Sequence, residues 1–203
     1  MPPIAISGAV EGDVDEAVLR RIVDDLGCYQ GPIYGKKGKP FLRTRVNAYN
    51  AAAQFSPWLV LVDLNGDFNC PSELRNDWLP VCEQRMCFRV AVRAIESWLI
   101  ADAQRFSEYF GVAMRHIPPN SESVRRPKQA LVNLVRQSRR REVREDMVPR
   151  PASGRQVGPA YSSHLIEFVS DKTQGWRPTI GANSCNSLKR CLDSLKVLIE
   201  AEE

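Results

Sequence analysis

The sequence predicts an α/β fold, in which a mostly parallel sheet carries helices on both faces and a mainly helical C-terminal extension follows. Short apolar runs alternate with segments whose apolar residues recur at helical spacing, and this alternation is typical of β-α-β units. The runs are apolar almost throughout, which indicates strands buried on both faces. A chain of 203 residues with 43% hydrophobic composition suits one globular domain, or a domain with an appendage.

The first half of the chain supplies the predicted strands. Residues 4–10 form the first strand, Gly12 marks the turn after it, and apolar residues at helical spacing predict a helix over about 14–26. The segment GPIYGKKGKPF, residues 31–41, is rich in glycine and lysine and is predicted to be a loop. The further predicted elements are a helix over 42–54, strands over 58–63 and 86–92, and a helix over 94–111.

The composition of the sequence changes after His116. A linker rich in proline and serine, IPPNSES, comes first, and helices are predicted near 128–144, 162–170 and 187–201. We therefore predict a core over residues 1–115 and a basic, mainly helical extension over residues 116–203 that packs on it.

The apolar runs are far shorter than a membrane span, and the first residues lack the basic-then-apolar order of a secretory signal. We expect a cytoplasmic protein that does not enter a membrane. The six cysteines include no C-x-x-C pair and there are only two histidines, so reduced structural thiols are favoured over disulfides or a zinc site.

Charge is distributed unevenly along the chain. Residues 125–155 contain ten Lys or Arg and three acids, whereas residues 11–25 contain six acids and two basic residues. A basic region beside an acidic pole is the pattern of an enzyme that acts on nucleic acid, although a solvated helix face explains the basic stretch equally well.

Acidic side chains follow two of the predicted strands. Asp63, Asn65 and Asp67 come at the end of the strand over 58–63, and Glu11 follows the first strand. Because the carboxyl ends of parallel strands share one edge of the sheet, these groups would face one another if the strands are neighbours. Carboxylate oxygens there suit Mg²⁺, but Asp and Asn are also ordinary turn formers and Glu11 an ordinary first-turn acid.

Two other motifs fail. An EF-hand loop starting at Asp63 would need glycine at its sixth position and glutamate at its twelfth, where the chain has Phe68 and Leu74. The lysine-rich loop does not match the phosphate-binding pattern G-x-x-x-x-G-K-[ST]. Its lysines are predicted only to contact backbone phosphates: Lys36, Lys37 and Lys39.

The order of these motifs resembles the Toprim domain of topoisomerases, primases, small ribonucleases and OLD-type (overcoming lysogenization defect) nucleases. More closely, the chain is similar to a family of small standalone Toprim-like proteins, mostly bacterial, whose genes often lie beside a gene for an ABC- or AAA-type ATPase. The matching segments span most of the chain: VEGDVDEAVLRRIVDDLG, VLVDLNGD, FRVAVRAIESWLIAD, RRPKQAL, GPAYSSHLIEFV and SLKRCL. The resemblance implies a Toprim-like (Rossmann-like) catalytic core.

The resemblance also implies roles for individual residues. Glu11 takes the proton-transfer or metal-associated role, and Asp63 is the first member of the magnesium-binding D-x-D. Asn65 stands where the second aspartate is expected, so that Asp67 would supply the missing charge and a two-metal mechanism is left open. Lys128 resembles a recurring lysine that neutralises charge at the scissile phosphate, although a solvated lysine at a helix start is the commoner case.

The segment AIESWLIAD adds another candidate acid. Glu96 and Asp102 are six residues apart, which places them about 600° round a helix, so only one of them is expected to point into the site. Glu96 is preferred because it lies close to a strand end. Arg93 would either bind phosphate or pair with Glu96.

The sequence thus predicts a nuclease that uses Mg²⁺ or Mn²⁺, with DNA or RNA as substrate. The resemblance implies that it is the effector subunit of an ATPase, in antiviral defence or DNA maintenance. Its formation of homo-oligomers is left open, and the alternative is a non-catalytic adaptor that binds the ATPase and nucleic acid. The predicted catalytic residues are Glu11, Asp63, Asp67, Glu96 and Lys128, the first four of which are also the predicted metal ligands. The predicted nucleic-acid contacts are Lys36, Lys37, Lys39, Arg93, Arg125, Arg126, Arg139, Arg140 and Arg141.

Overall fold

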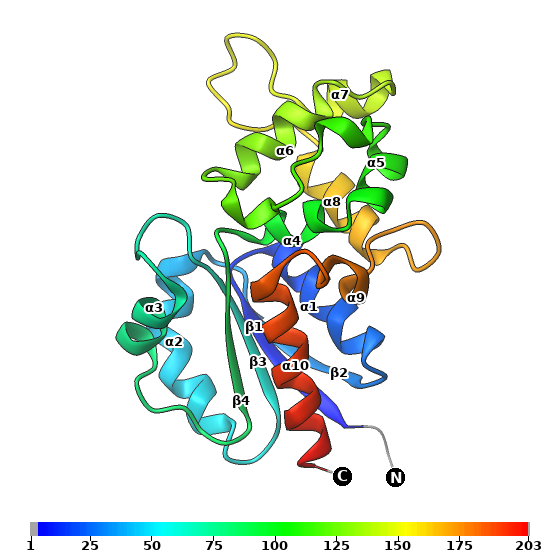
Figure 1. The fold of residues 1–203 in the computed structure, drawn as a ribbon. Helices are drawn as coiled ribbons and strands as arrows, with labels where there is room; N and C mark the ends of the chain where they lie inside the picture. Colours follow the sequence, from blue (N-terminus) through cyan, green and yellow to red (C-terminus); the bar gives the residue numbers. More distant parts are fainter. Residues whose placement is uncertain (1–3, 203) are drawn as a thin grey trace.

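The computed structural model describes residues 4–202, which form one four-stranded sheet with all strands parallel. The order across the sheet is β2-β1-β3-β4 (Figure 1). The strands are β1 (Ala5–Val10), β2 (Tyr29–Gly35), β3 (Trp58–Asp63) and β4 (Met86–Ala91). The predicted α/β class with a parallel sheet is confirmed, and the architecture is consistent with a Rossmann-like fold. The Toprim assignment stays a prediction.

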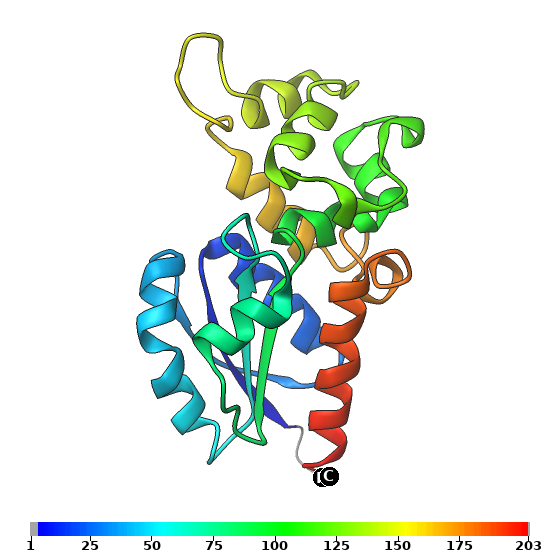
Figure 2. The same cartoon turned by 60° about the vertical axis from the view of Figure 1, so that its left-hand side comes forward.

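Helices cover both faces of the sheet, as Figure 2 shows. On one face lie α1 (Asp13–Asp25) and α10 (Asn186–Glu200), and on the other lie α2 (Lys39–Ala52) and α3 (Pro71–Trp78). Alternate residues of a strand point to opposite faces. Leu59 and Leu61 therefore join the core with α1, while Val60 and Val62 join the core with α2 and α3. This double burial explains why β3 is apolar over Trp58 to Val62.

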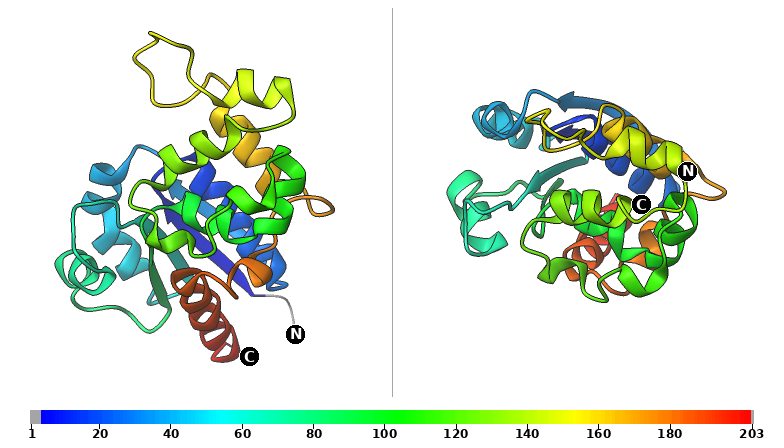
Figure 3. Two further views of the ribbon diagram at one scale, coloured as in Figure 1. Left: turned by 45° about the horizontal axis from the view of Figure 1, so that its top comes forward. Right: turned by 90° about the horizontal axis from the view of Figure 1, so that it is seen from above.

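A further group of helices lies over the edge of the sheet where the strands end (Figures 1 and 3). These elements are α4 (Ile95–Ala101), α5 (Ala103–Phe110), α6 (Pro127–Val135), α7 (Arg141–Met147) and α8 (Tyr161–Ser170), with the short 3-10 helices η1 (Met114–His116) and η2 (Ser121–Ser123). The rings of Phe106, Phe110 and Phe168 pack together, with centroids 4.8 to 6.2 Å apart. Because they come from α5 and α8, this cluster fixes the two helices to each other.

The last helix of the described chain packs against the sheet. The short helix α9 (Pro178–Gly181) leads into α10, which packs against β4. The predicted extension, residues 116–203, therefore includes one of the helices that cover the sheet. The division between residues 115 and 116 stays a prediction.

The prediction of a loop over residues 31–41 is wrong for its first part, because β2 occupies residues 29–35. β2 lies at the edge of the sheet and has no buried residue, so it lacks the apolar run that predicts a strand. Gly31 allows β2 to lie close to β1, since a Cβ there would lie 2.9 Å from the carbonyl oxygen of Ile6. α2 also starts earlier than predicted, at Lys39.

Two long predicted helices are each divided in two. The helix over 94–111 breaks at Asp102, which ends α4 and caps α5 by accepting a hydrogen bond from the backbone N–H of Arg105. The helix over 128–144 breaks after α6, where the Ser138 hydroxyl donates to the carbonyl of Phe110. Both breaks depend on contacts that helical periodicity does not encode. α3 and α9 were not predicted at all.

No helix within residues 4–202 combines the length and the apolar character needed to span a membrane. No disulfide joins any of the six cysteines, all of which belong to the described part of the chain.

Candidate active site

The ends of β1 and β3 bring Glu11 and Asp63 together. The two strands are parallel neighbours, with Ala9 opposite Val60 in the register, so the residues that follow them share one edge of the sheet. The backbone N–H of Asp63 donates to Oε1 of Glu11 at 2.8 Å. The two acids predicted from separate strand ends are therefore adjacent.

The segment after β4 adds Glu96 to this edge. Oδ1 of Asp63 accepts a hydrogen bond of 2.8 Å from the backbone N–H of Ile95, at the start of α4. The next residue, Glu96, is only 4% exposed, accepts a 3.1 Å hydrogen bond from the Tyr161 hydroxyl, and lies 3.7 Å from Nζ of Lys128. Burial, followed by the negative charge of Glu96, raises the pKa of Tyr161, so the phenol stays a donor.

Asp102 lies apart from these acids. Its carboxylate forms two contacts with the guanidinium of Arg177, at 2.7 and 2.9 Å, and accepts from the backbone N–H of Arg177 at 3.0 Å. The residue is 1% exposed. Asp102 is therefore a buried structural acid that anchors the segment before α9.

Asp15, in the first turn of α1, interacts with Glu11 and Glu96 and was not predicted as a site residue. Burial, and then the charges of Glu11 and Glu96, raise its pKa from 3.8 to about 7. The sequence signal was present, because Asp15 follows Glu11 by four residues in VEGDVDE. However, three acids in a first helical turn are also what the helix dipole favours, so nothing in the spacing distinguishes Asp15 from Asp13 and Glu16.

We call Glu11, Asp15, Asp63 and Glu96 the acidic cluster. Burial is the main reason that the pKa of Asp63 is well above its ordinary value, and the charges of Asp15, Glu96 and Glu11 raise it further. Burial also raises the pKa of Glu11, against the opposing effect of the Asp63 N–H and Lys39. Acids whose pKa values are raised by burial and by neighbouring acids are common at catalytic and cation-binding sites.

The donor chemistry of the acidic cluster fits a hard divalent cation. All four side chains offer carboxylate oxygens, the ligands that Mg²⁺ and Mn²⁺ prefer, and the charges of neighbouring acids raise the pKa of Asp15 and Asp63. As the side chains stand, no group of three or more His, Cys, Asp or Glu in residues 4–202 is gathered closely enough to hold a metal ion. The metal therefore stays a prediction.

The loop after β3 departs from the predicted metal site. Asp67 is 56% exposed and pairs with Nζ of Lys39 at 2.8 Å. The same ammonium group donates to the carbonyl oxygens of Asp63 and Leu64. Asn65 is exposed and has a left-handed backbone, with φ of 53°, a conformation that asparagine tolerates well. Asp67 is thus neutralised by lysine, and Asn65 has a conformational reason to be there.

A cleft of about 660 Å³ opens beside the acidic cluster. Asp63 and Glu96 line it together with the basic residues Arg93, Arg125, Arg126 and Lys128. Arg93 makes no ion pair with Glu96 in the described residues, since the only cation paired with that carboxylate there is Lys128. Four of the predicted phosphate-binding or catalytic basic residues therefore share one cleft with two of the acids.

The remaining predicted nucleic-acid contacts lie outside this cleft. Lys36 pairs with Glu16 at 2.7 Å, and Lys37 lies 5.2 Å from the centre of the Phe41 ring. In the segment after α6, Arg140 pairs with Glu142 and Arg141 with Glu145, while the backbone of Arg139 bonds to Gly111. The predicted basic surface is therefore divided into three groups: the cleft residues, the lysines at and before the start of α2, and the arginines at the start of α7.

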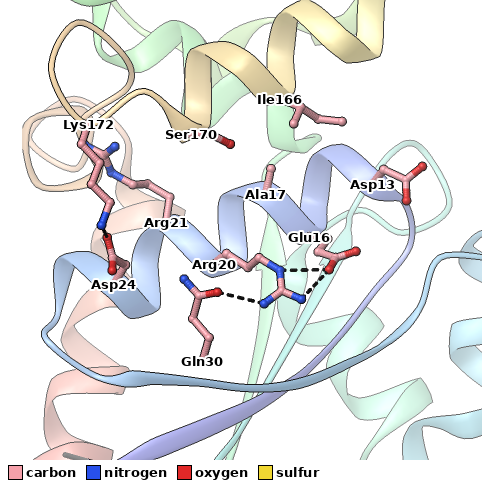
Figure 4. Close-up of a pocket in the computed structure, with 10 residues that line it drawn as sticks. All are labelled: Asp13, Glu16, Ala17, Arg20, Arg21, Asp24, Gln30, Ile166, Ser170 and Lys172. Carbon is pink, nitrogen blue, oxygen red and sulfur yellow. Dashed lines mark hydrogen bonds and ion pairs between the residues drawn. The ribbon is translucent and has the colours of Figure 1, made fainter.

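A second cleft, between α1 and α8, is shown in Figure 4. Several of its charged side chains pair within it: Arg20 contacts Glu16 and also Gln30, and Lys172 pairs with Asp24. It contains no residue of the acidic cluster. We therefore choose the cleft beside Asp63 as the candidate active site.

The chain was compared with models of protein families, with curated proteins and with solved structures, and none of the three comparisons gave a match. The relationship to Toprim proteins stays a prediction, and the candidate site is defined by its own geometry.

Proposed function

We propose that the protein is a nuclease that uses Mg²⁺ or Mn²⁺ to hydrolyse phosphodiester bonds of DNA or RNA. One observation carries the proposal: Asp63, whose pKa is raised mainly by burial, and the buried Glu96 line the same cleft as Arg93, Arg125, Arg126 and Lys128. Acidic side chains can hold a metal ion, and basic side chains can bind the phosphate. Phosphodiester hydrolysis of this kind requires both.

Within this proposal each group has a role. Asp63 and Glu96, with Asp15 beside them, would hold the metal ion, which when bound supplies charge neutralisation at the phosphate and a more acidic water molecule. The arginines bind the phosphate oxygens. Lys128, close to Glu96, stabilises the charge that develops as the P–O bond breaks and the bond from water to phosphorus forms.

Glu11 is the proposed base. Its raised pKa makes it a better proton acceptor than an exposed glutamate, so that it can take the proton that the attacking water loses. The leaving oxygen then receives a proton from solvent or from a protonated acid of the cluster. Tyr161 keeps the Glu96 carboxylate in place by donating to it at 3.1 Å.

The experiment is cleavage of plasmid DNA, single-stranded DNA and total tRNA in Mg²⁺, Mn²⁺ or EDTA. Metal-dependent cutting that is lost in Asp63→Asn and Glu11→Gln supports the proposal and identifies the substrate. Asp13→Asn is the matched control, because Asp13 is an exposed acid of the same first turn that does not line the cleft. Cutting that persists in Asp63→Asn would reject this site.

A second candidate is a non-catalytic adaptor that binds an ABC- or AAA-type ATPase and nucleic acid. The observation that favours it is Lys39, whose ammonium group already neutralises Asp67 and donates hydrogen bonds to the carbonyl oxygens at the end of β3. An adaptor would bind nucleic acid without cutting it, with or without the ATPase, and Asp63→Asn would leave that binding unchanged.

The cellular setting is also a proposal. By the resemblance of its motifs, the protein would act in the cytoplasm as the effector of its ATPase, in antiviral defence or DNA maintenance.

A further inference from the structure

β4 is an edge strand, and its outward-facing backbone groups can be identified from the register. Trp58 donates to the carbonyl of Arg85 and Leu64 to the carbonyl of Ala91, so the backbone groups of residues 87, 89 and 91 face β3. Those of residues 86, 88 and 90 therefore face away from the sheet.

The chain itself closes the two ends of this edge. At its start, Met86 donates to the carbonyl of Glu83, and the Cys82 thiol donates to the carbonyl of Met86. After its end, the backbone N–H of Val92 donates to Oγ of Ser187 on α10 at 3.2 Å.

Phe88 and Val90, between these closed ends, are only 4% and 8% exposed. Their outward N–H and C=O groups have no hydrogen-bond partner in residues 4–202. Backbone groups at such burial are normally paired, with protein or with water, so this short strip offers an open edge that another strand can join.

A groove runs beside the strip, between α3 and α10, which flank β4 in Figure 2. It consists of two adjoining hollows of about 440 and 430 Å³ that share Arg89. The first is lined by α3, β4 and the start of α10. The second combines the apolar residues Met86, Val197 and Leu198 with polar ones, among them the acid Asp193. Val197 is 65% exposed although it is a large apolar residue.

The first hollow is positively charged. Arg75 and Arg190 line it, are exposed, and have no acidic partner within residues 4–202. Glu122 is the one acid among its described lining residues, and its two carboxylate oxygens already accept hydrogen bonds from the backbone N–H groups of Asn186 and Ser187. The occupant that fits is therefore acidic.

A second copy of the chain fits this edge poorly. Antiparallel pairing of β4 with itself, centred on the open strip, would bring Arg89 opposite Arg89, and like charges directly opposite each other destabilise a strand pair. We propose that the groove binds an extended, acidic segment of a partner protein, which adds to β4 as a fifth strand. This surface is independent of the candidate active site.

The test uses a blocked octapeptide in which valine alternates with glutamate, beside the same peptide with lysine in place of glutamate. Fluorescence anisotropy measures affinity, and amide hydrogen exchange locates the contact. The glutamate peptide is expected to bind and to slow exchange of the Phe88 and Val90 amides about tenfold or more. The lysine peptide is expected not to bind.

Charge reversal tests the same surface. Arg75→Glu and Arg190→Glu are each expected to weaken binding about tenfold. Lys189→Glu is the matched control, because Lys189 is exposed on α10 but does not line the groove. Equal affinity for the two peptides, binding that leaves the Phe88 and Val90 amides unprotected, or no binding of either peptide would overturn the proposal. So would a dimer that protects these amides without any peptide.

Discussion

The backbone N–H of Asp63 donates a hydrogen bond to the side chain of Glu11 at 2.8 Å. This bond joins the ends of β1 and β3 and gives Glu11 two separate roles. It is the proposed base, and it also satisfies a backbone donor at the end of a buried strand. Substitutions that remove one role and keep the other can separate chemistry from structure.

Glu11→Gln and Glu11→Ala form such a pair. Glutamine keeps an oxygen that accepts from Asp63 but loses the proton acceptor, so cleavage is expected to fall about 10²–10⁴-fold with little change in stability. Alanine also leaves the Asp63 N–H without a partner, which costs about 1–3 kcal/mol of unfolding free energy. Cleavage rates and urea unfolding measure the two effects, and equal stability loss in both variants would contradict the structural role.

The acidic cluster predicts how stability changes with pH. Asp15 has a pKa of about 7 in the folded protein, above its ordinary value of 3.8, so folding favours its protonated form. Its contribution to stability is therefore greatest below pH 4 and is lost as the pH rises to 7 and beyond.

Asp15→Asn removes this loss. Since one pKa unit corresponds to about 1.4 kcal/mol, the variant is expected to be about 2–4 kcal/mol more stable than the wild type at pH 8 and equally stable at pH 4. Denaturant unfolding across this range is the measurement, with Asp13→Asn as the control that leaves the profile unchanged. Equal stability of the variant and the wild type at pH 8 would show that Asp15 is well solvated.

Binding of a divalent cation should relieve the same repulsion. At a concentration about 100 times its dissociation constant, Mg²⁺ is expected to add about 2.7 kcal/mol to the unfolding free energy at pH 8. NaCl at equal ionic strength controls for screening, and Asp63→Asn should remove most of the gain. Thermal unfolding in Mg²⁺ and in EDTA gives the answer without any nuclease assay, and equal melting temperatures would argue against a metal site.

Much of this site follows from the sequence, because it depends on strand ends. Glu11 and Asp63 each follow an apolar run, and neighbouring parallel strands bring such residues to one edge. The separation of Glu96 from Asp102 follows in the same way from the geometry of a helix, although the break between α4 and α5 does not.

The rest of the site depends on packing between distant segments. Asp67 lies close in sequence to the predicted metal-binding residue Asp63. However, it pairs with Lys39 at the start of α2, and hydrophobic periodicity does not predict that contact. Asp15 becomes part of the acidic cluster because it is buried beside Glu11 and because α4 brings Glu96 to the same edge. β2 was missed because an exposed edge strand has no apolar run.

Asp102 provides a test of the distinction between structural and catalytic acids. Arg177→Ala would leave the Asp102 carboxylate buried without its cation, which costs about 3–5 kcal/mol of unfolding free energy. At a temperature where the variant is still folded, cleavage is expected to match the wild type. A specific loss of cleavage in the folded variant would place Asp102 among the catalytic groups.

The separation of the predicted basic residues into different regions leads to a prediction about nucleic-acid binding. Arg125 and Arg126 line the cleft beside the acidic cluster, whereas Arg141 lies outside it and pairs with Glu145. Each cleft arginine that contacts a phosphate releases counterions on binding, so Arg125→Ala and Arg126→Ala should each reduce the salt slope of the binding constant by about one. Arg141→Ala is the matched control and should leave the slope unchanged.

Anisotropy titrations with labelled single-stranded DNA in EDTA, at several salt concentrations, measure the slopes without cleavage. The opposite ranking, with Arg141→Ala reducing the slope and the cleft variants unaffected, would move the nucleic acid to the α7 surface and separate binding from the acidic cluster.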